Sequence, residues 1–426
     1  MEWLGLARTR FTHSQDTIKL KKNDGQETDL LTICQDSTPP CKLNPIMFNG
    51  HLQTMWTAVK KEGPAIHYKR KIFESNDPAF EGSFAVDFVA SPSNKIDDTL
   101  PPRTTYYSDQ EFEDMKLEFD NNRPMLVVLH GLTGGSYEIY LKHVLEPLVN
   151  AEREWKWDAC VINSRGCARH KISSSILYNA RATWDCRQTV LWLRKTFPKK
   201  QLFGIGFSLG ANILTNYVAE EGPTCKFKAV VVISNPWALE ISSVALQKTW
   251  IGREVYSKTM GGNLKRLLEL HYDQVSKNSK LDFEKIRKAV YIHEFDRLVQ
   301  GPTWGYPTEG AYYRDASSVD SLFAVKIPFF AINAEDDPIV TNDAIPYEEI
   351  KQIPNAVLCT TSLGGHLSWY EVGGNQWHAR PAVNFFNKMA FEIKSEISEV
   401  IPWEGNNKSD HGVKKFDPMR RKWRVY

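Results

Sequence analysis

The sequence has few cysteines and no pattern among them. Seven occur in 426 residues, which is an odd number, and no two have the C-x-x-C spacing of zinc and redox motifs. A disulfide framework needs paired cysteines, and a structural zinc site needs clustered ligands. The cysteines therefore argue against both, and we expect a protein of a reducing compartment, the cytoplasm.

Long apolar runs and an excess of charge are missing as well. No uninterrupted apolar stretch approaches the ~20 residues of a membrane span, and the opening MEWLGLARTRFTHSQD has no apolar core of signal-peptide length. The net charge of +2 gives no indication of a nucleic-acid partner. The sequence thus predicts a soluble protein without a transmembrane segment.

Motifs for metals and cofactors are also absent from the sequence. It contains no H-x-x-x-H pair, and no phosphate-binding glycine-rich loop or basic cluster for a coenzyme. No internal repeat is visible. We expect no cofactor and no metal, and a metalloenzyme mechanism is disfavoured.

The most informative stretch present is Leu202 to Tyr217, LFGIGFSLGANILTNY. An apolar strand leads into Ser208, and residues with helical spacing follow it. Residues 206–210 match G-x-S-x-G, the nucleophile elbow, in which a tight strand-to-helix turn presents the serine hydroxyl. The motif alone is weak because an ordinary turn between a strand and a helix can contain the same residues.

The surrounding chain alternates buried strands with helices. Apolar runs at 125–130, 160–163, 202–207, 229–234 and 327–334 are typical of strands buried on both faces of a sheet. Their alternation with helical segments predicts a mostly parallel central sheet with helices on both faces, the α/β class. Residues 68–74 and 82–90 are expected to pair as an antiparallel hairpin.

We divide the chain by composition and pattern. The main domain is expected to span residues 44–400 and to end in a helix at about 377–397. The other predicted parts are a flexible arm at 1–43, a surface insert at about 91–122, a helical cap at about 237–325 and a polar tail at 401–426.

A serine nucleophile needs a base and an acid that orients the base. In this class of fold the order along the chain is serine, acid, histidine. Asp337 follows the buried strand at 327–334, at the carboxyl edge of the sheet where ligands bind. It is our choice of acid, with the adjacent Asp336 as the first alternative and Glu335 as the second.

The base is predicted to be His366. It follows the next short strand and stands in a glycine-rich loop that leaves room for an imidazole. The competing histidines lie on the following helix (His378) or in the cap (His271, His293). His51, in the lead-in to the domain, is interpreted as a packing or capping residue.

Two backbone N–H groups are expected to form the oxyanion hole. One belongs to Leu209, directly after the serine, and the other to the loop that starts at His130, where Leu132 is the best candidate. Glycines 131, 134 and 135 suit a loop whose amides turn inward. His130 itself is expected to support the loop and not to transfer protons.

Together these motifs resemble those of the AB hydrolase superfamily, AB hydrolase 4 family. That family includes fungal monoacylglycerol lipases and medium-chain fatty acid ethyl ester synthase/esterases. The resemblance extends from about residue 44 to 394, and motif matching assigns the triad to Ser208, Asp337 and His366. It is carried by NGHLQT (49–54), HGLTGGS (130–136), NSRGC (163–167), GFSLGAN (206–212), DDPIV (336–340) and GGHLSW (364–369).

The resemblance implies an α/β-hydrolase fold and a serine esterase or lipase that hydrolyses acyl esters of lipids, either monoacylglycerols or medium-chain fatty acyl esters. One alternative is an alcohol O-acyltransferase that uses the same triad to make ethyl esters. A second alternative is a non-catalytic binding protein on the same scaffold. Peripheral contact with membranes or lipid droplets is plausible for a lipid esterase.

Overall fold

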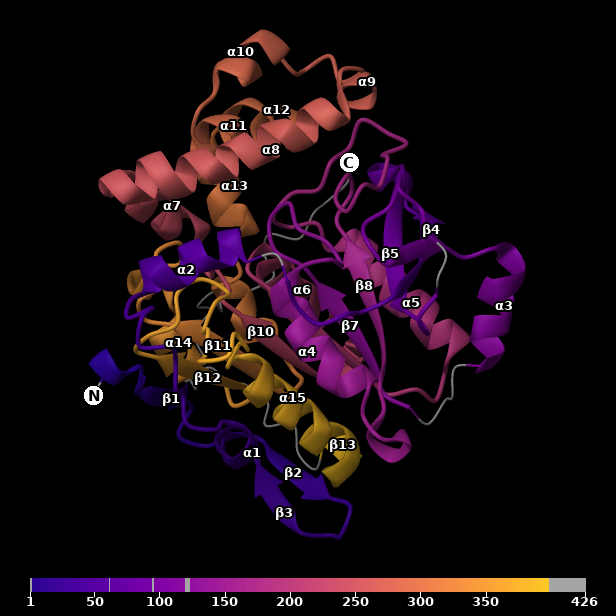
Figure 1. Ribbon diagram of the computed structural model, residues 1–426, viewed down its shortest axis with the longest axis vertical. Helices are drawn as coiled ribbons and strands as arrows, with labels where there is room; N and C mark the ends of the chain where they lie inside the picture. Colours follow the sequence, from indigo (N-terminus) through magenta and orange to yellow (C-terminus); the bar gives the residue numbers. More distant parts are fainter. Residues whose placement is uncertain (1, 61, 94–95, 119–122, 398–426) are drawn as a thin grey trace, which may run out of the picture.

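The computed structural model describes residues 2–60, 62–93, 96–118 and 123–397 (Figure 1). Its centre is one sheet in which β12 to β8 run parallel, while β1 and β5 are antiparallel to their neighbours. The order across the sheet is β1 (Thr9–His13), β12 (Ala356–Thr361), β11 (Phe329–Ala334), β10 (Phe227–Ile233), β9 (Leu202–Phe207), β7 (Met125–Leu129), β8 (Asp158–Asn163), β5 (Ser83–Val89), β4 (Tyr68–Glu74) and β6 (Thr104–Tyr106).

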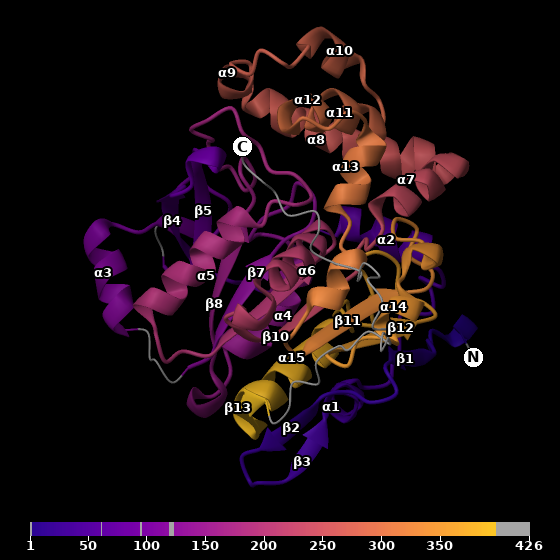
Figure 2. The same cartoon turned by 180° about the vertical axis from the view of Figure 1, so that it is seen from behind.

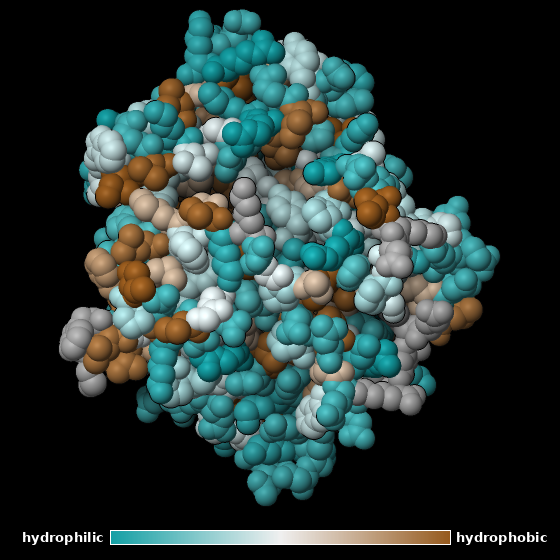
Figure 3. Space-filling view, in the orientation of Figure 1, coloured by the Kyte–Doolittle hydropathy of each residue, from teal (hydrophilic) through white to brown (hydrophobic). Residues whose placement is uncertain are grey.

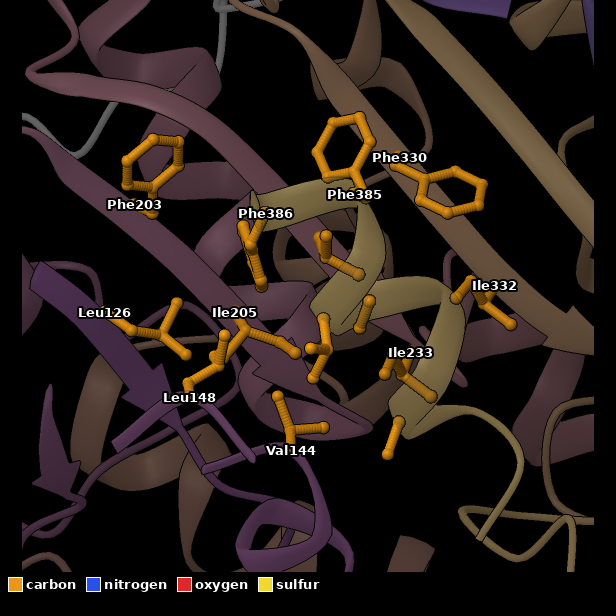
Figure 4. Packing of buried hydrophobic residues seen from close by; sticks show 14 of the residues in the cluster. Leu126, Val144, Leu148, Phe203, Ile205, Ile233, Phe330, Ile332, Phe385 and Phe386 are labelled. Atoms are coloured by element: carbon orange, nitrogen blue, oxygen red, sulfur yellow. The ribbon is translucent and has the colours of Figure 1, made fainter. Parts of the chain in front are cut away.

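Alternate residues of the central strands enter two separate apolar cores. In β10, Val231 and Ile233 belong to one core, whereas Val230 and Val232 belong to the other, as the two-residue period of a strand requires. The first core lies under α1 (Leu30–Ser37), α4 (Ile139–Val149) and α15 (Ala379–Asn387) (Figure 4). The second lies under α3 (Asp109–Glu118), α5 (Trp184–Thr196), α6 (Leu209–Glu221) and α14 (Tyr347–Ile350).

This arrangement confirms the predicted fold class, a mostly parallel sheet with helices on both faces. The expected hairpin is confirmed too, because β4 and β5 pair antiparallel over their full length. Short 3-10 turns connect several elements: η1 (Glu2–Leu4), η2 (Pro78–Phe80), η3 (Arg153–Trp155), η4 (Gly222–Thr224) and η7 (Asn342–Ala344).

The insertion between β10 and β11 is helical and forms a layer of its own at the top of Figures 1 and 2. It has a small apolar core that includes Leu264, Leu268 and Phe295, and we keep the name cap for residues 237–325. Its elements are α7 (Leu239–Lys248), the π-helix η5 (Gly252–Ser257), α8 (Lys258–Leu270), α9 (Tyr272–Val275), α10 (Phe283–Lys288), α11 (Ile292–Leu298), α12 (Gln300–Trp304), α13 (Glu309–Ala316) and η6 (Asp320–Ala324).

The N-terminal segment differs from the flexible arm expected at 1–43. Its strand β1 forms an edge of the central sheet by pairing with β12, and α1 buries Leu30, Ile33 and Cys34. The strands β2 (Lys19–Lys22) and β3 (Glu27–Asp29) form a second, small sheet. The polar composition hid these elements because β2 buries only one residue, Leu20, between exposed lysines.

The expected surface insert and the last helix also need correction. Within 91–122, β6 pairs with β4, and α3 buries Phe112 and Met115 despite its many acidic residues. After α15 the chain forms a π-helix, η8 (Lys388–Glu392), and continues as β13 (Ile393–Ile397), which pairs with β2. The predicted tail at 401–426 lies outside the described residues.

Candidate active site

Ser208 occupies the turn between β9 and α6 in a backbone conformation that few residues adopt. Its φ is 51° and its ψ is −118°. A Cβ at Gly206 would lie 2.6 Å from the Ala211 Cα, and one at Gly210 would lie 2.4 Å from the Leu129 carbonyl oxygen. Both positions of the motif therefore need glycine, because the helix approaches the sheet too closely for any side chain.

Three side chains that are far apart in the sequence meet beside this turn. His366 Nε2 lies 2.8 Å from Ser208 Oγ, and His366 Nδ1 lies 2.7 Å from Asp337 Oδ2. Ser208 follows β9, Asp337 follows β11 and His366 follows β12, so all three stand at the carboxyl edge of the sheet. The structure thus brings together the three residues that the sequence suggested as a triad.

The carboxylate of Asp337 is fully engaged. Its Oδ1 accepts hydrogen bonds from the N–H groups of Ile339 (2.8 Å) and Val340 (2.9 Å), which leaves Oδ2 for His366. The side chain is fully buried. These hydrogen bonds hold the carboxylate in one orientation.

The two alternative acids have other partners. Asp336 Oδ1 accepts the N–H of Gly365 at 2.9 Å, and burial raises the pKa of the Asp336 carboxyl to about 6. Glu335 accepts a hydrogen bond from the Thr360 hydroxyl. Asp336 therefore supports the backbone of the histidine loop, while Asp337 contacts the imidazole itself.

The histidine loop is held from outside by α2 (Gly50–Val59), a role that the sequence analysis missed. The N–H of His366 donates to Thr54 Oγ1 at 2.9 Å. A Cβ at Gly365 would lie 2.6 Å from the Gly50 carbonyl oxygen, and one at Gly50 would lie 1.9 Å from that of Asp336. The NGHLQT motif therefore seats a helix against both the acid loop and the histidine loop.

His51 and the three histidines that competed with His366 contact other parts of the fold. His51 Nδ1 lies 2.9 Å from the Tyr256 hydroxyl, and its ring stacks on that tyrosine. His378 is buried with Nε2 near the Tyr140 carbonyl oxygen, and burial lowers its pKa to about 3. His271 contacts the Gly166 carbonyl oxygen, and His293 stacks on Tyr291.

The proposed oxyanion donors stand beside the serine. Leu132 and Leu209 line the same cavity as Ser208. Leu209 is the first residue of α6, so its N–H has no partner within the helix. Within the described part of the chain, neither N–H donates a hydrogen bond to another residue. Both amides are therefore available to an oxyanion.

His130 organises the first of these loops. Its Nε2 accepts the N–H of Ser164 at 3.0 Å, so Nδ1 carries the proton and donates to the Gly131 carbonyl oxygen at 2.7 Å. Burial lowers the pKa of this imidazole to about 4. The ring stays neutral near pH 7 and supports the loop, as the sequence suggested.

An apolar cavity with a volume of about 110 Å³ opens at Ser208. Leu246, Met260, Leu264 and Ile292 of the cap line it opposite the sheet. Such a lining suits an acyl chain. Among the residues that the structure describes, no three His, Cys, Asp or Glu side chains lie close enough together to hold a metal ion.

Comparisons with known proteins agree with this geometry. The family model described as alpha/beta hydrolase fold matches residues 124–371. A monoacylglycerol lipase of Saccharomyces cerevisiae is 35% identical over 401 residues, which cover 88% of this chain and 87% of the relative.

Two further relatives carry related names. Medium-chain fatty acid ethyl ester synthase/esterase 2 of S. cerevisiae is 29% identical over 82% of this chain and 85% of its own length. The human phospholipase ABHD3 is 27% identical over 76% of this chain and 72% of its own length. All three names describe proteins that act on esters of fatty acids or lipids.

Proposed function

The chain belongs to the alpha/beta hydrolase fold family, and from this membership we propose that it is a serine esterase that hydrolyses acyl esters of lipids. The observation that carries the proposal is the hydrogen-bonded series from Ser208 through His366 to Asp337 at the mouth of an apolar cavity. The names of the relatives favour monoacylglycerols or medium-chain fatty acyl esters as substrates.

The first half of the proposed reaction acylates the serine. Ser208 Oγ attacks the ester carbonyl carbon while His366 Nε2 takes the hydroxyl proton. Asp337 fixes the imidazole with its Nδ1–H donating and stabilises the imidazolium that forms. The N–H groups of Leu209 and Leu132 stabilise the tetrahedral oxyanion. The alcohol then leaves with the proton from His366.

The second half removes the acyl group. His366 takes a proton from a water molecule, the resulting hydroxide attacks the acyl-serine carbonyl carbon, and a second oxyanion occupies the same two amides. Its collapse returns the proton to Ser208 and releases the fatty acid. No redox step, metal or cofactor enters this cycle.

A chain-length series of monoacylglycerols and ethyl esters, run with wild type and Ser208→Ala, tests the proposal. We expect hydrolysis by the wild type and a loss of about 10⁴ to 10⁶ in kcat in the variant. Hydrolysis that persists undiminished in Ser208→Ala would refute it. A wild-type enzyme whose Ser208 is not labelled by a fluorophosphonate would refute it equally.

Transfer of the acyl group to an alcohol is a second candidate activity, favoured by the relative named as an ethyl ester synthase/esterase. The same acyl-serine would then be attacked by ethanol in place of water. Ester synthesis and hydrolysis, measured in one reaction mixture at matched alcohol concentrations, separate the two. A synthesis rate above the hydrolysis rate would favour the transferase.

We further propose that the enzyme works at the surface of a membrane or lipid droplet. Large apolar side chains are exposed on residues 46–59 and 241–251, and the His51–Tyr256 contact joins the first segment to η5, which follows the second. Brown atoms gather over α2 and α7 in Figure 3. We call this set the apolar rim: Ile46, Phe48, Leu52, Met55, Trp56, Val59, Ile241, Val244, Trp250 and Ile251.

A peripheral mode of binding is consistent with two further observations. None of the described helices has both the length and the apolarity needed to span a bilayer. Exposed Trp56 (45%) and Trp250 (70%) are the kind of side chain that inserts at the boundary between headgroups and acyl chains. A cytoplasmic location is part of the proposal, supported by seven cysteines that are all unpaired.

A further inference from the structure

The cavity at Ser208 contains polar atoms that its apolar lining does not explain. Asn179 is 1% exposed and Ser242 is 6% exposed, and both line the cavity. Among the residues that the structure describes, neither Asn179 Nδ2 nor Ser242 Oγ has a hydrogen-bond partner. Buried polar groups without partners are costly and rare, so each of these atoms needs a partner that the described part of the chain does not supply.

A buried carboxyl group lies in the same cavity. Asp296 of α11 is 5% exposed, and its Oδ2 accepts a hydrogen bond from the Tyr313 hydroxyl at 2.6 Å. Its Oδ1 has no partner among the described residues. Burial raises the pKa of this carboxyl to about 7, so the group carries both its protonated and its ionised form near neutral pH.

These three side chains come from separate parts of the fold. Asn179 lies in the loop between β8 and α5, Ser242 on α7 and Asp296 on α11. Hydrogen bonds fix two of them: Asn179 Oδ1 accepts the N–H of Arg181 at 2.8 Å, and Asp296 is held by Tyr313. The free atoms of these three cavity-lining residues comprise an amide donor, a hydroxyl and a carboxyl oxygen.

We propose that Asp296, Asn179 and Ser242 bind the free hydroxyl groups of the glycerol part of a monoacylglycerol. The proposal rests on ester hydrolysis at Ser208. A hydroxyl group needs both an acceptor and a donor, and this set offers both: the carboxyl oxygen accepts, the amide donates and the serine does either. The same atoms would stay unpaired with an ester of a simple alcohol. Asp296 is thus a specificity residue and has no part in bond breaking.

Two substrates that differ only in these hydroxyl groups make the test. Propyl octanoate has the carbon skeleton of 1-monooctanoylglycerol without its two free hydroxyls. The quantity to measure is the ratio of kcat/KM for the glyceride to kcat/KM for the propyl ester. We expect Asp296→Asn to lower this ratio about tenfold and Ser242→Ala to lower it about threefold, the size expected for lost hydrogen bonds.

Ser242→Ala is the variant least expected to misfold, because its hydroxyl has no partner among the described residues and its removal leaves none of their polar groups unsatisfied. Ser321→Ala is the matched control, since that buried hydroxyl bonds Asn216 and lies outside the cavity lining. It should leave the ratio unchanged. A ratio unaltered in both Asp296→Asn and Ser242→Ala would overturn the proposal, as would an equal fall in Ser321→Ala.

The same data separate this inference from the proposed function. If wild type hydrolyses both esters and Ser208→Ala neither, the esterase proposal stands whatever the ratio does. If Ser208→Ala hydrolyses both as fast as the wild type, the esterase proposal fails and the glycerol site falls with it.

Discussion

The two walls of the cavity are built differently. On the sheet side, every polar atom of the Ser208, His366 and Asp337 side chains has a partner within 2.9 Å. On the cap side, within the described ranges, the Ser242 hydroxyl has no partner, and Asp296 engages only one of its two oxygens. The three triad side chains are satisfied without a ligand, and the two cap side chains are not.

The difference separates two tasks. Attack on an ester requires groups held in one geometry before the substrate arrives, and a closed set of hydrogen bonds on the rims of neighbouring strands provides that. Selecting a substrate requires hydrogen-bonding groups that have no partner until the substrate binds. The sheet wall is therefore suited to chemistry and the cap wall to selection.

The largest expected effect tests the assignment of the acid on the sheet wall. Asp337→Asn should lower kcat about 10⁴-fold, because an amide does not stabilise the imidazolium and permits the wrong tautomer. Asp336→Asn is the matched neighbour and should lower kcat less than about tenfold. Steady-state hydrolysis of one ester by both variants measures the contrast.

The reverse order of these two losses would make Asp336 the functional acid. Equal losses would mean that the two carboxylates act together. Either result would contradict a sheet wall in which Asp337 alone orients the base.

A second test concerns the apolar rim. Replacing Trp56 and Trp250 together with serine should weaken binding to lipid vesicles about tenfold or more, because large apolar surfaces no longer enter the lipid. Vesicle co-sedimentation measures this. Hydrolysis of a short, water-soluble ester is the control and should stay near the wild-type rate. Unchanged vesicle binding would remove the rim from the proposal.

A third and smaller effect is expected from the support behind His366. Thr54→Val removes the hydroxyl that accepts the His366 N–H and keeps the shape of the side chain. We expect kcat to fall about threefold to tenfold, the scale of one lost hydrogen bond. Thr57→Val on the same helix, whose hydroxyl contacts Ser368, is the comparison and should lose less.

The smallest effect is on stability, and its dependence on pH distinguishes the two walls. Burial raises the pKa of the Asp296 carboxyl to about 7 and that of Asp336 to about 6, from ordinary values of 3.8. The folded state then binds the proton more tightly than the unfolded state does. Each carboxyl group's contribution to the free energy of unfolding is therefore highest at low pH and declines as the pH rises from the ordinary pKa to the raised one.

The corresponding asparagine variants should show this in thermal melts. The melting temperature of Asp296→Asn relative to wild type should rise from pH 5 up to about pH 8, by about a few degrees. The melting temperature of Asp336→Asn relative to wild type should level off at a pH about one unit lower. A relative melting temperature for Asp296→Asn that does not change with pH would mean that this carboxyl is not desolvated.

The sheet wall was accessible from the sequence, and the cap wall was not. Ser208, Asp337 and His366 each follow an apolar strand. Residues that follow parallel strands lie at the same edge of the sheet. Glycines at 206 and 210 marked the tight turn, because only they tolerate the approach of α6. Local pattern and chain order together were enough to predict that these three side chains meet at one edge of the sheet.

Other features depend on contacts that no local pattern reveals. Thr54 acts on His366 across a long stretch of chain, and β1 owes its place to pairing with β12 at the opposite end of the sequence. Asn179 and Ser242 line the same cavity as Ser208 only because the cap folds back over the serine. Contacts of this kind leave no spacing pattern in the sequence.

The most direct measurement is covalent labelling with a fluorophosphonate, followed by peptide mapping. Ser208 Oγ should displace fluoride from phosphorus, leaving one adduct on the peptide that contains Ser208, formed much more slowly in His366→Ala. An adduct on a different residue, or labelling of Ser208 that does not depend on His366, would contradict the assignment of this serine as the activated nucleophile.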